Sequence, residues 1–303
     1  MNINNLVREN IKSLKPYSSA RDEFKEFKTD MVFLDANENP FENGVNRYPD
    51  PQQNDLKAEL SKLKRIPTNQ ILLGNGSDEV IDLAFRIFCR PGIDKALIFS
   101  PTYGMYDVSA SINNVALIKL PLNKDFQLDL EKIKPYLSDN NIKLIFICSP
   151  NNPTGNLINK ADIEFILNNF NGIVMIDEAY IDFAKNDSLI NLINQYNNLV
   201  VSQTFSKAWG LAAARIGVAY SNEEIISQIE DMKERIEAFL YVVKWVHALC
   251  EDRDDWEELI NIMHWVNRIN MYTWEKLEDC DLWEKMIHEH PNNAAAYQAQ
   301  NFG

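Results

Sequence analysis

A run of reactive side chains follows the short apolar segment 198–201. It offers hydroxyls at Thr204 and Ser206, an amine at Lys207 and a guanidinium at Arg215. Hydroxyls and an arginine suit a dianionic phosphate, and a lysine amine forms Schiff bases with carbonyl compounds. If a helix begins near Lys207, Arg215 lies about two turns along it, near the same face. The run predicts a site for a phosphorylated carbonyl compound; an ordinary helix with a solvated lysine is the simpler alternative.

A second candidate is the glycine-rich segment 74–79, with the sequence GNGSDE. It joins a strand-like run to a helical pattern, so its backbone N–H groups could hold a phosphate against the helix N-terminus. A plain helix cap by Ser77 or Asp78 is the alternative. The segment also matches a dinucleotide-binding fingerprint except that Glu79 replaces the third glycine, which leaves an NAD(P)-binding α/β protein as a competing interpretation.

A third group of side chains could bind a flat aromatic ring. Asp177 ends an apolar run, and a carboxylate there could pair with a protonated ring nitrogen or simply cap a helix. Asn152 and Tyr180 could each donate a hydrogen bond to a phenolate oxygen, and Tyr103 could stack on the ring. A turn and buried aromatic packing explain these three equally well. A magnesium-dependent nucleotide hydrolase is set aside because the chain has no GxxxxGK[ST] loop.

The elements that position these residues follow a regular alternation. Apolar strands are predicted at 70–73, 96–99, 115–120, 143–148, 173–177 and 198–201, and helices at 54–64, 80–89, 105–112, 128–137 and 160–169. In the first helix, Leu56, Leu60 and Leu63 are expected to lie on one face. The alternation predicts an α/β fold with a mainly parallel sheet covered by helices. Ligands of such sheets bind at the carboxyl ends of the strands, where every reactive segment above is placed.

Composition narrows the functional class. The chain has 303 residues, 46% of them apolar, and a net charge of -14. That length supports one large core or two domains, and the charge argues against a nucleic-acid partner. No apolar run is long enough for a membrane span. The four cysteines have no metal-site spacing, so a reducing cytoplasm is expected, with Cys89 and Cys148 as small core residues.

The C-terminal part has a different composition. Residues 222–290 hold 18 acidic and 7 basic residues, and four tryptophans recur every nine residues from Trp256 to Trp283. These features predict a smaller, mostly helical acidic region at 226–290 and a disordered tail at 291–303. His288 and His290 do not share a helical face, so no metal site is expected.

Seven motifs together resemble those of the fold type I pyridoxal-phosphate aminotransferases, and most closely the histidinol-phosphate aminotransferases. They are LDANENP at 34–40, RYPDP at 47–51, GSDE at 76–79, SPTYGMY at 100–106, CSPNNPTG at 148–155, DEAY at 177–180 and TFSKA at 204–208. The likeness covers about residues 1–225. It implies an N-terminal arm and small-domain segment at 1–40, and a large domain at 41–225 that binds pyridoxal 5'-phosphate.

The resemblance also implies a role for each matching residue. Lys207 would bind the cofactor covalently and move a proton, and Asp177 would pair with the pyridine nitrogen. Asn152 and Tyr180 would hold the phenolate oxygen, and Tyr103 would stack on the ring. The cofactor phosphate would be bound by the amides of Ser77 and Asp78, by Thr204, Ser206 and Arg215, and by Tyr48 of a second subunit, which implies a homodimer.

The implied reaction moves an amino group between glutamate and imidazole-acetol phosphate in histidine biosynthesis. The family's arginine for the substrate carboxylate has no recognisable counterpart after residue 225, where Arg235, Arg253 and Arg268 lie in other contexts. A chain that binds the cofactor without catalysis, or with altered specificity, and uses its acidic helices for interaction is therefore an alternative.

Overall fold

The computed structural model describes residues 3–12, 38–39, 41, 46–47, 50, 52–184 and 187–233. All of them belong to one compact unit, residues 1–243. Tyr48, the tryptophan-rich part of the predicted acidic region and the predicted tail lie outside the described residues. Of the region predicted to begin at residue 226, the described part is helical and belongs to α7 (Glu223–Lys233).

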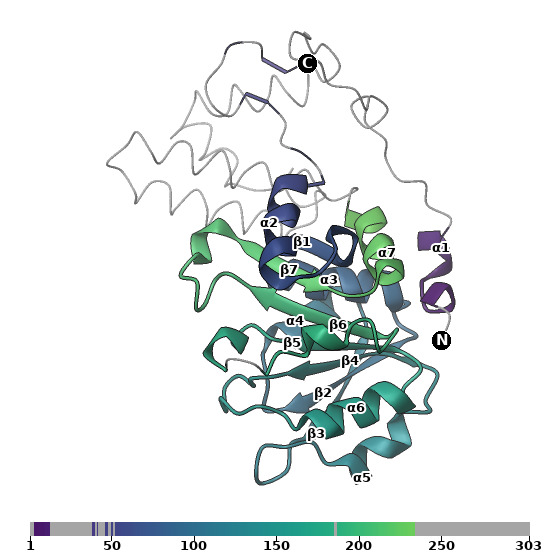
Figure 1. Ribbon diagram of the computed structural model, residues 1–303. Coiled ribbons are helices and arrows are strands. Elements are labelled where there is room, and N and C mark those ends of the chain that lie inside the picture. The colour runs from purple at the N-terminus through teal and green to yellow at the C-terminus, as the bar shows by residue number, and fades with distance from the viewer. Residues whose placement is uncertain are drawn as a thin grey trace, which may run out of the picture. The chain divides into compact units, whose positions relative to one another are not determined.

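The described residues form a seven-stranded sheet in the order β1-β7-β6-β5-β4-β2-β3 (Figure 1). Its strands are β1 (Ile71–Asn75), β2 (Lys95–Ser100), β3 (Ala116–Pro121), β4 (Ile142–Cys148), β5 (Ile173–Asp177), β6 (Leu199–Thr204) and β7 (Ile216–Tyr220). Within this sheet β7 alone runs opposite to the others, because it pairs antiparallel with both β1 and β6. The prediction of a mainly parallel sheet is confirmed, although β7 itself was not predicted.

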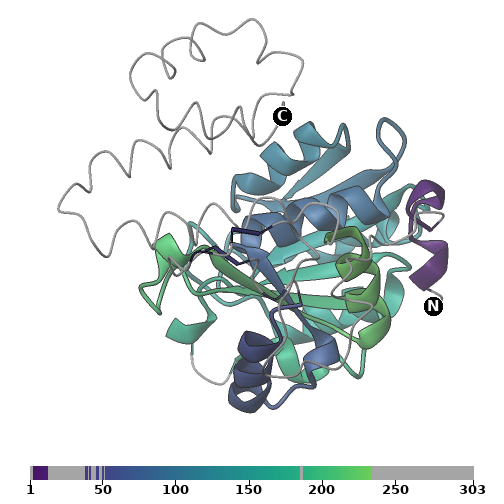
Figure 2. The same cartoon turned by 90° about the horizontal axis from the view of Figure 1, so that it is seen from above.

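Helices cover both faces of the sheet, as Figures 1 and 2 show. They are α1 (Glu9–Lys12), α2 (Asn54–Lys64), α3 (Ser77–Phe88), α4 (Met105–Ile112), α5 (Leu130–Ile133), α6 (Lys160–Asn169) and α7. Residues of α1, α3, α4 and α7 share one buried apolar cluster, and residues of α2 and α6 share the other. The central strands are buried along nearly their whole length, as parallel strands between two helical layers must be.

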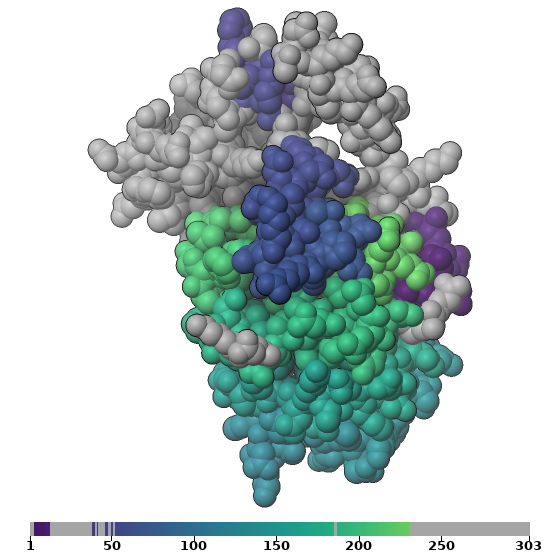
Figure 3. All heavy atoms as spheres, viewed as in Figure 1, coloured from purple at the N-terminus to yellow at the C-terminus, as the bar shows by residue number. Residues whose placement is uncertain are grey.

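The first helix buries only one of the three leucines that were expected to share a face. Leu60 is buried, but Leu56 and Leu63 are 38% and 55% exposed. Lys57 is buried instead, because it forms an ion pair with Glu230 of α7. The space-filling view shows the segment that contains α2 and β1, in blue, lying against the last strands, in green (Figure 3), as the pairing of β1 with β7 requires.

The helix expected to begin near Lys207 is not formed. Within the described residues 205–215, the chain makes a reversing loop whose helical part is the short 3-10 turn Ala212–Ala214. The backbone N–H of Phe205 donates to the carbonyl of Ile216 at 3.0 Å, which closes this loop. The loop joins the antiparallel neighbours β6 and β7, and the left-handed conformations of Gly210 (φ 67°) and Arg215 (φ 51°) interrupt any helix and help the chain reverse.

Candidate active site

Five of the loops that follow parallel strands meet at the carboxyl edge of the sheet. One of these five, the loop that follows β6, also leads into β7 at the same edge, because β7 runs in the opposite direction. Together they enclose one cavity, lined by Gly76, Ser77, Asp78, Tyr103, Cys148, Asn152, Asp177, Ala179, Tyr180, Thr204, Ser206, Lys207 and Arg215. The structure therefore brings together every predicted site residue in the described part of the chain.

One end of the cavity holds a buried carboxylate. Asp177 is the last residue of β5 and is 2% exposed. Its Oδ1 accepts a hydrogen bond from the backbone N–H of Ala179 at 3.1 Å, and its Oδ2 accepts one from the hydroxyl of Tyr106 at 2.7 Å. Burial raises the pKa of Asp177, and the hydrogen bond from Tyr106 opposes that rise. The carboxylate is thus held in a dry site with two fixed donors.

Tyr106 was not predicted as a site residue. It is fully buried in α4 and looks, from the sequence, like one more core aromatic. The available signal was its position three residues after Tyr103, at the first turn of a helix that starts beside the cavity. Its hydroxyl is the second hydrogen-bond donor to the Asp177 carboxylate, after the backbone N–H of Ala179.

The amine of Lys207 follows β6, the strand between β5 and β7. The Nζ atom of Lys207 lies 5.7 Å from the centroid of the Tyr180 ring. The Asn152 side-chain amide donates to the Tyr180 hydroxyl at 3.5 Å. Cys148, predicted as a core residue, is buried and also lines the cavity. Burial raises the pKa of its thiol to about 12, so the thiol is neutral at physiological pH.

The other end of the cavity is shaped by backbone. A Cβ atom on Gly217 would lie 2.2 Å from the carbonyl carbon of Gly76 and 2.3 Å from the backbone nitrogen of Ser77. A Cβ atom on Gly76, whose φ is 75°, would lie 2.4 Å from an Nη atom of Arg215. The glycines thus let the β1–α3 loop, β7 and the arginine approach within contact distance. The result is a cluster of backbone amides next to a guanidinium.

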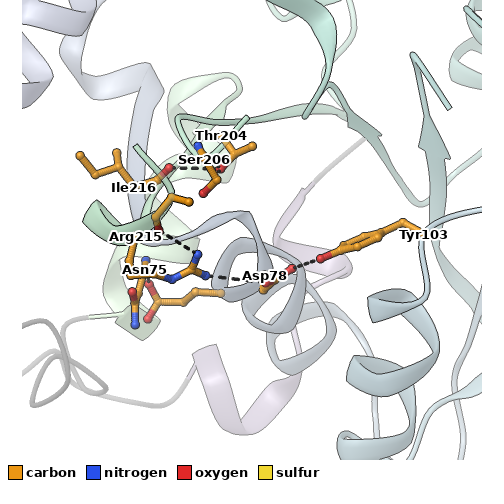
Figure 4. A network of polar contacts seen from close by, with 9 residues as sticks. Asn75, Asp78, Tyr103, Thr204, Ser206, Arg215 and Ile216 are labelled. Atoms are coloured by element: carbon orange, nitrogen blue, oxygen red, sulfur yellow. Dashed lines mark hydrogen bonds and ion pairs between the residues drawn. The ribbon is translucent and has the colours of Figure 1, made fainter. Parts of the chain in front are cut away.

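A polar network links the first turn of α3 to the β2–α4 loop and to the β6–β7 loop (Figure 4). The Tyr103 hydroxyl donates to Asp78 Oδ1 at 3.0 Å, and Arg215 Nη2 lies 3.8 Å from Asp78 Oδ2. Across the cavity, the backbone N–H of Ser206 donates to Thr204 Oγ1 at 3.2 Å. Asp78 therefore joins the predicted ring-stacking tyrosine to the predicted phosphate-binding arginine.

Glu79 has a local structural role. Its Oε2 accepts a hydrogen bond from the backbone N–H of Asn75 at 2.6 Å, which closes the β1–α3 turn. The position where a dinucleotide fingerprint has its third glycine is therefore occupied by a side chain folded back on its own loop. This geometry gives no support to the NAD(P)-binding alternative.

The residues present fit pyridoxal phosphate. The buried carboxylate of Asp177 could pair with the cofactor's protonatable ring nitrogen. The amides, hydroxyls and Arg215 at the glycine-shaped end could bind its dianionic phosphate. The amine of Lys207 and the phenol of Tyr180 line the same cavity, and they suit an aldehyde beside a ring hydroxyl. The fit rests on the chemistry and order of the donors along one cavity.

Comparison with known proteins identifies relatives of the chain. The model of the family "aminotransferase class I and II" matches residues 35–258, so the match runs past residue 225, to which the resemblance seen in the sequence extends. A histidinol-phosphate aminotransferase of Flavobacterium johnsoniae is 50% identical over 280 residues, which cover 88% of this chain and 79% of that protein. The enzyme of the same name from Christiangramia forsetii is 55% identical over 232 residues, which cover 77% of this chain and 66% of that protein.

Solved structures agree on the fold. The histidinol-phosphate aminotransferase of Clostridium acetobutylicum is similar with a TM-score of 0.56 and 28% identity, covering 61% of this chain and 55% of that one. The Sinorhizobium meliloti enzyme of that name, solved in complex with pyridoxal 5'-phosphate, has a TM-score of 0.59 and 24% identity and covers 71% of this chain and 59% of that one. The chain thus spans little more than half the length of these two structures.

Proposed function

Because the chain belongs to the aminotransferase class I and II family, we propose that it is a pyridoxal-phosphate-dependent transaminase. Its substrates would be glutamate and imidazole-acetol phosphate, between which it would move an amino group in histidine biosynthesis. The observation that carries this proposal is one cavity lined by Lys207, the buried carboxylate of Asp177 and Arg215, in which Lys207 follows β6, the strand between β5, which ends in Asp177, and β7, which follows Arg215. Named relatives at 50–55% identity support the choice of substrates.

Pyridoxal phosphate, when bound, supplies a carbonyl for amine exchange and a ring that accepts electrons from the substrate. Asp177 would hold the ring nitrogen in its protonated form, because a buried carboxylate favours a cation beside it. Asn152 and Tyr180 would hold the ring oxygen, and Tyr103 would lie against the ring. Lys207 would bind the carbonyl carbon and move a proton to and from the substrate's α carbon.

At the phosphate end we assign the amides of Ser77 and Asp78, the hydroxyls of Thr204 and Ser206, and the guanidinium of Arg215. Each is a hydrogen-bond donor that favours an anion, and Arg215 supplies the countercharge. We also propose a homodimer, with Tyr48 of one subunit completing the phosphate site of the other, and a cytoplasmic location. Among the described residues no helix is both long and apolar enough to cross a membrane.

The test is to map the lysine that carries the cofactor. Borohydride reduction of the full chain with bound pyridoxal phosphate, followed by peptide mapping, should label Lys207. Lys207→Ala should abolish the label and lower transamination at least ~10³-fold, because both the covalent link and the proton carrier are lost. Lys160→Ala is the matched control, since Lys160 lies on the surface of α6 in an ion pair with Glu164.

Two results would separate the alternatives. A labelled peptide without Lys207 would overturn the proposal. Labelled Lys207 together with no change in the cofactor's absorbance on adding glutamate would show a cofactor-binding chain that does not turn over.

A further inference from the structure

A buried hydroxyl next to Asp177 stands out from the residues assigned above. Tyr106 has no solvent exposure, and its hydroxyl donates to Asp177 Oδ2 at 2.7 Å. A buried phenol needs a hydrogen-bond partner. The partner of Tyr106 is Asp177, the carboxylate that would pair with the cofactor's ring nitrogen in the proposed function. A tyrosine of the other apolar cluster shows the contrast: Tyr220 is equally buried, and its hydroxyl has no hydrogen-bond partner among the described residues.

The ring of Tyr106 is fixed by its packing. It stacks on Phe146 with ring centroids 4.9 Å apart, and Phe146 stacks in turn on Phe85 at 5.1 Å. Tyr103 meets it edge-on at 5.7 Å. Because the ring cannot swing, the hydroxyl points at one place, and the oxygen of Asp177 that it holds cannot rotate away.

The pairing of β4 with β5 places Cys148 directly beside Asp177, and the Cys148 thiol lies next to the Tyr106 hydroxyl. The groups that face Asp177 from the surrounding elements are Tyr106 from α4, Cys148 from β4, Asp78 from the first turn of α3, Tyr103 from the loop between β2 and α4, the amide of Ala179, and Lys207. Burial and Asp78 raise the pKa of Asp177, whereas Tyr106, Ala179 and Lys207 lower it, with Tyr106 the largest of these.

We infer that Tyr106 is a positioning residue for the cofactor: its hydroxyl keeps the Asp177 carboxylate ionised and oriented toward a cationic ring nitrogen. The inference rests on the proposed function. It requires a donor at Oδ2, because a buried carboxylate with one oxygen unpaired would take up a proton and lose its preference for a cation. Tyr106 acts on the ring only through Asp177 and does not touch the substrate.

Tyr106→Phe is the direct test, because it keeps the ring packing and removes only the hydroxyl. The affinity of the full chain for pyridoxal phosphate, measured by fluorescence titration from pH 5 to pH 9, should fall about tenfold at pH 7. Without the donor, Asp177 takes up its proton at a higher pH. The acid limb of the affinity profile should therefore move to higher pH. Tyr220→Phe, the matched control, should leave both the affinity and the limb unchanged.

A second variant covers the case in which Tyr106→Phe does not fold. Site-specific replacement of Tyr106 by 3-fluorotyrosine keeps the ring and the hydroxyl but makes the hydroxyl a stronger donor. It should move the acid limb to lower pH, opposite to Tyr106→Phe. A merely structural role for Tyr106 would change stability and leave the limb in place.

An acid limb that stays in place in the folded variants would overturn the inference, as would a shift of equal size in Tyr220→Phe. If the wild-type chain binds no pyridoxal phosphate, both the proposed function and the role of Tyr106 fail. If the wild-type chain binds and Lys207 is labelled while the limb stays in place, only the role of Tyr106 fails.

Discussion

The two ends of the cavity are built in different ways. The carboxylate end belongs to the core: Asp177 ends a buried strand, and Tyr106 approaches from a helix packed on aromatic rings. The phosphate end belongs to loops, and residues 207–213 of the reversing loop are exposed. Its shape comes from glycine backbone, with Gly217 lying against the Gly76–Ser77 peptide.

This difference separates two ways of preparing a site for one ligand. At the carboxylate end, side-chain packing fixes a hydrogen bond, so substitutions there should alter protonation. At the phosphate end, backbone contacts fix the donors, so substitutions there should alter the fold or the affinity and leave the pH profile in place. Each prediction below tests one side of that contrast.

The largest effect is expected from Gly217→Ala. The new Cβ atom would lie within 2.4 Å of three backbone atoms of Gly76 and Ser77, none of which can move like a side chain. We expect a loss of about 3 kcal/mol in the free energy of unfolding, or about 10 °C in Tm, measured by calorimetry on the cofactor-free protein.

Gly104→Ala is the control for this experiment. No atom lies within 4 Å of the position of its Cβ, and its φ of -71° suits any residue. Its Tm should stay within about 2 °C of the wild type. Equal Tm values for the two alanine variants would show that the backbone at the phosphate end is not closely packed.

Much of the fold, and the place of the cavity, was predictable from the sequence. Apolar runs predicted six of the seven strands, and the motif residues at their ends predicted the edge where the cavity forms. The antiparallel strand β7 was missed because its run, IGVAY, follows a stretch read as helix, and nothing local shows that the chain reverses at residues 205–215.

The residues of the cavity differ in what could be foreseen. Lys207 and Asp177 have reactive side chains in recognisable motifs, and Arg215 belongs to the run of reactive side chains after residue 201, so all three could be proposed directly. Tyr106 could not, because a buried tyrosine in a core and one beside a carboxylate have the same local sequence pattern. The exposure of Leu56 and Leu63 was equally hidden, since it depends on Lys57 meeting Glu230 from a distant helix.

A smaller effect is expected from Arg215→Met. The substitution keeps most of the side-chain length and removes the guanidinium that lies 3.8 Å from Asp78. Affinity for pyridoxal phosphate should fall about 10- to 100-fold, because a charged donor to the phosphate is lost and Asp78 keeps its negative charge. Fluorescence titration in competition with inorganic phosphate measures the loss.

The control is Arg86→Met, which removes a guanidinium paired with Asp82 on α3 and should leave the affinity unchanged. The acid limb of the affinity profile should also stay in place in Arg215→Met, in contrast to Tyr106→Phe. A limb that moves with Arg215 would mean that the two ends titrate together, and the contrast between them would be lost.

The smallest effect is expected in the stability of the cofactor-free protein. Burial raises the pKa of Asp177, so the folded chain binds a proton at pH values where the unfolded chain has already lost it. Stability therefore falls as the pH rises from the ordinary carboxyl range through the folded pKa of Asp177, and stays lower above it. In Asp177→Asn the side chain cannot ionise. The free energy of unfolding of this variant should exceed that of the wild type by about 1 kcal/mol at pH 8, and the difference should shrink as the pH is lowered.

Glu178, the next residue, provides the contrast that makes this result specific. It is also buried, but it accepts hydrogen bonds from Ser188, from the Leu189 amide and from Gln203, all within the fold. Glu178→Gln places an amide among those donors and should destabilise the protein by about 2 kcal/mol. Melting curves from pH 5 to pH 8 measure both variants. Stabilisation by Asp177→Asn together with destabilisation by Glu178→Gln would show that Glu178 stabilises the fold, whereas Asp177 lowers its stability and serves a ligand. Destabilisation by both substitutions would mean that Asp177 also stabilises the fold.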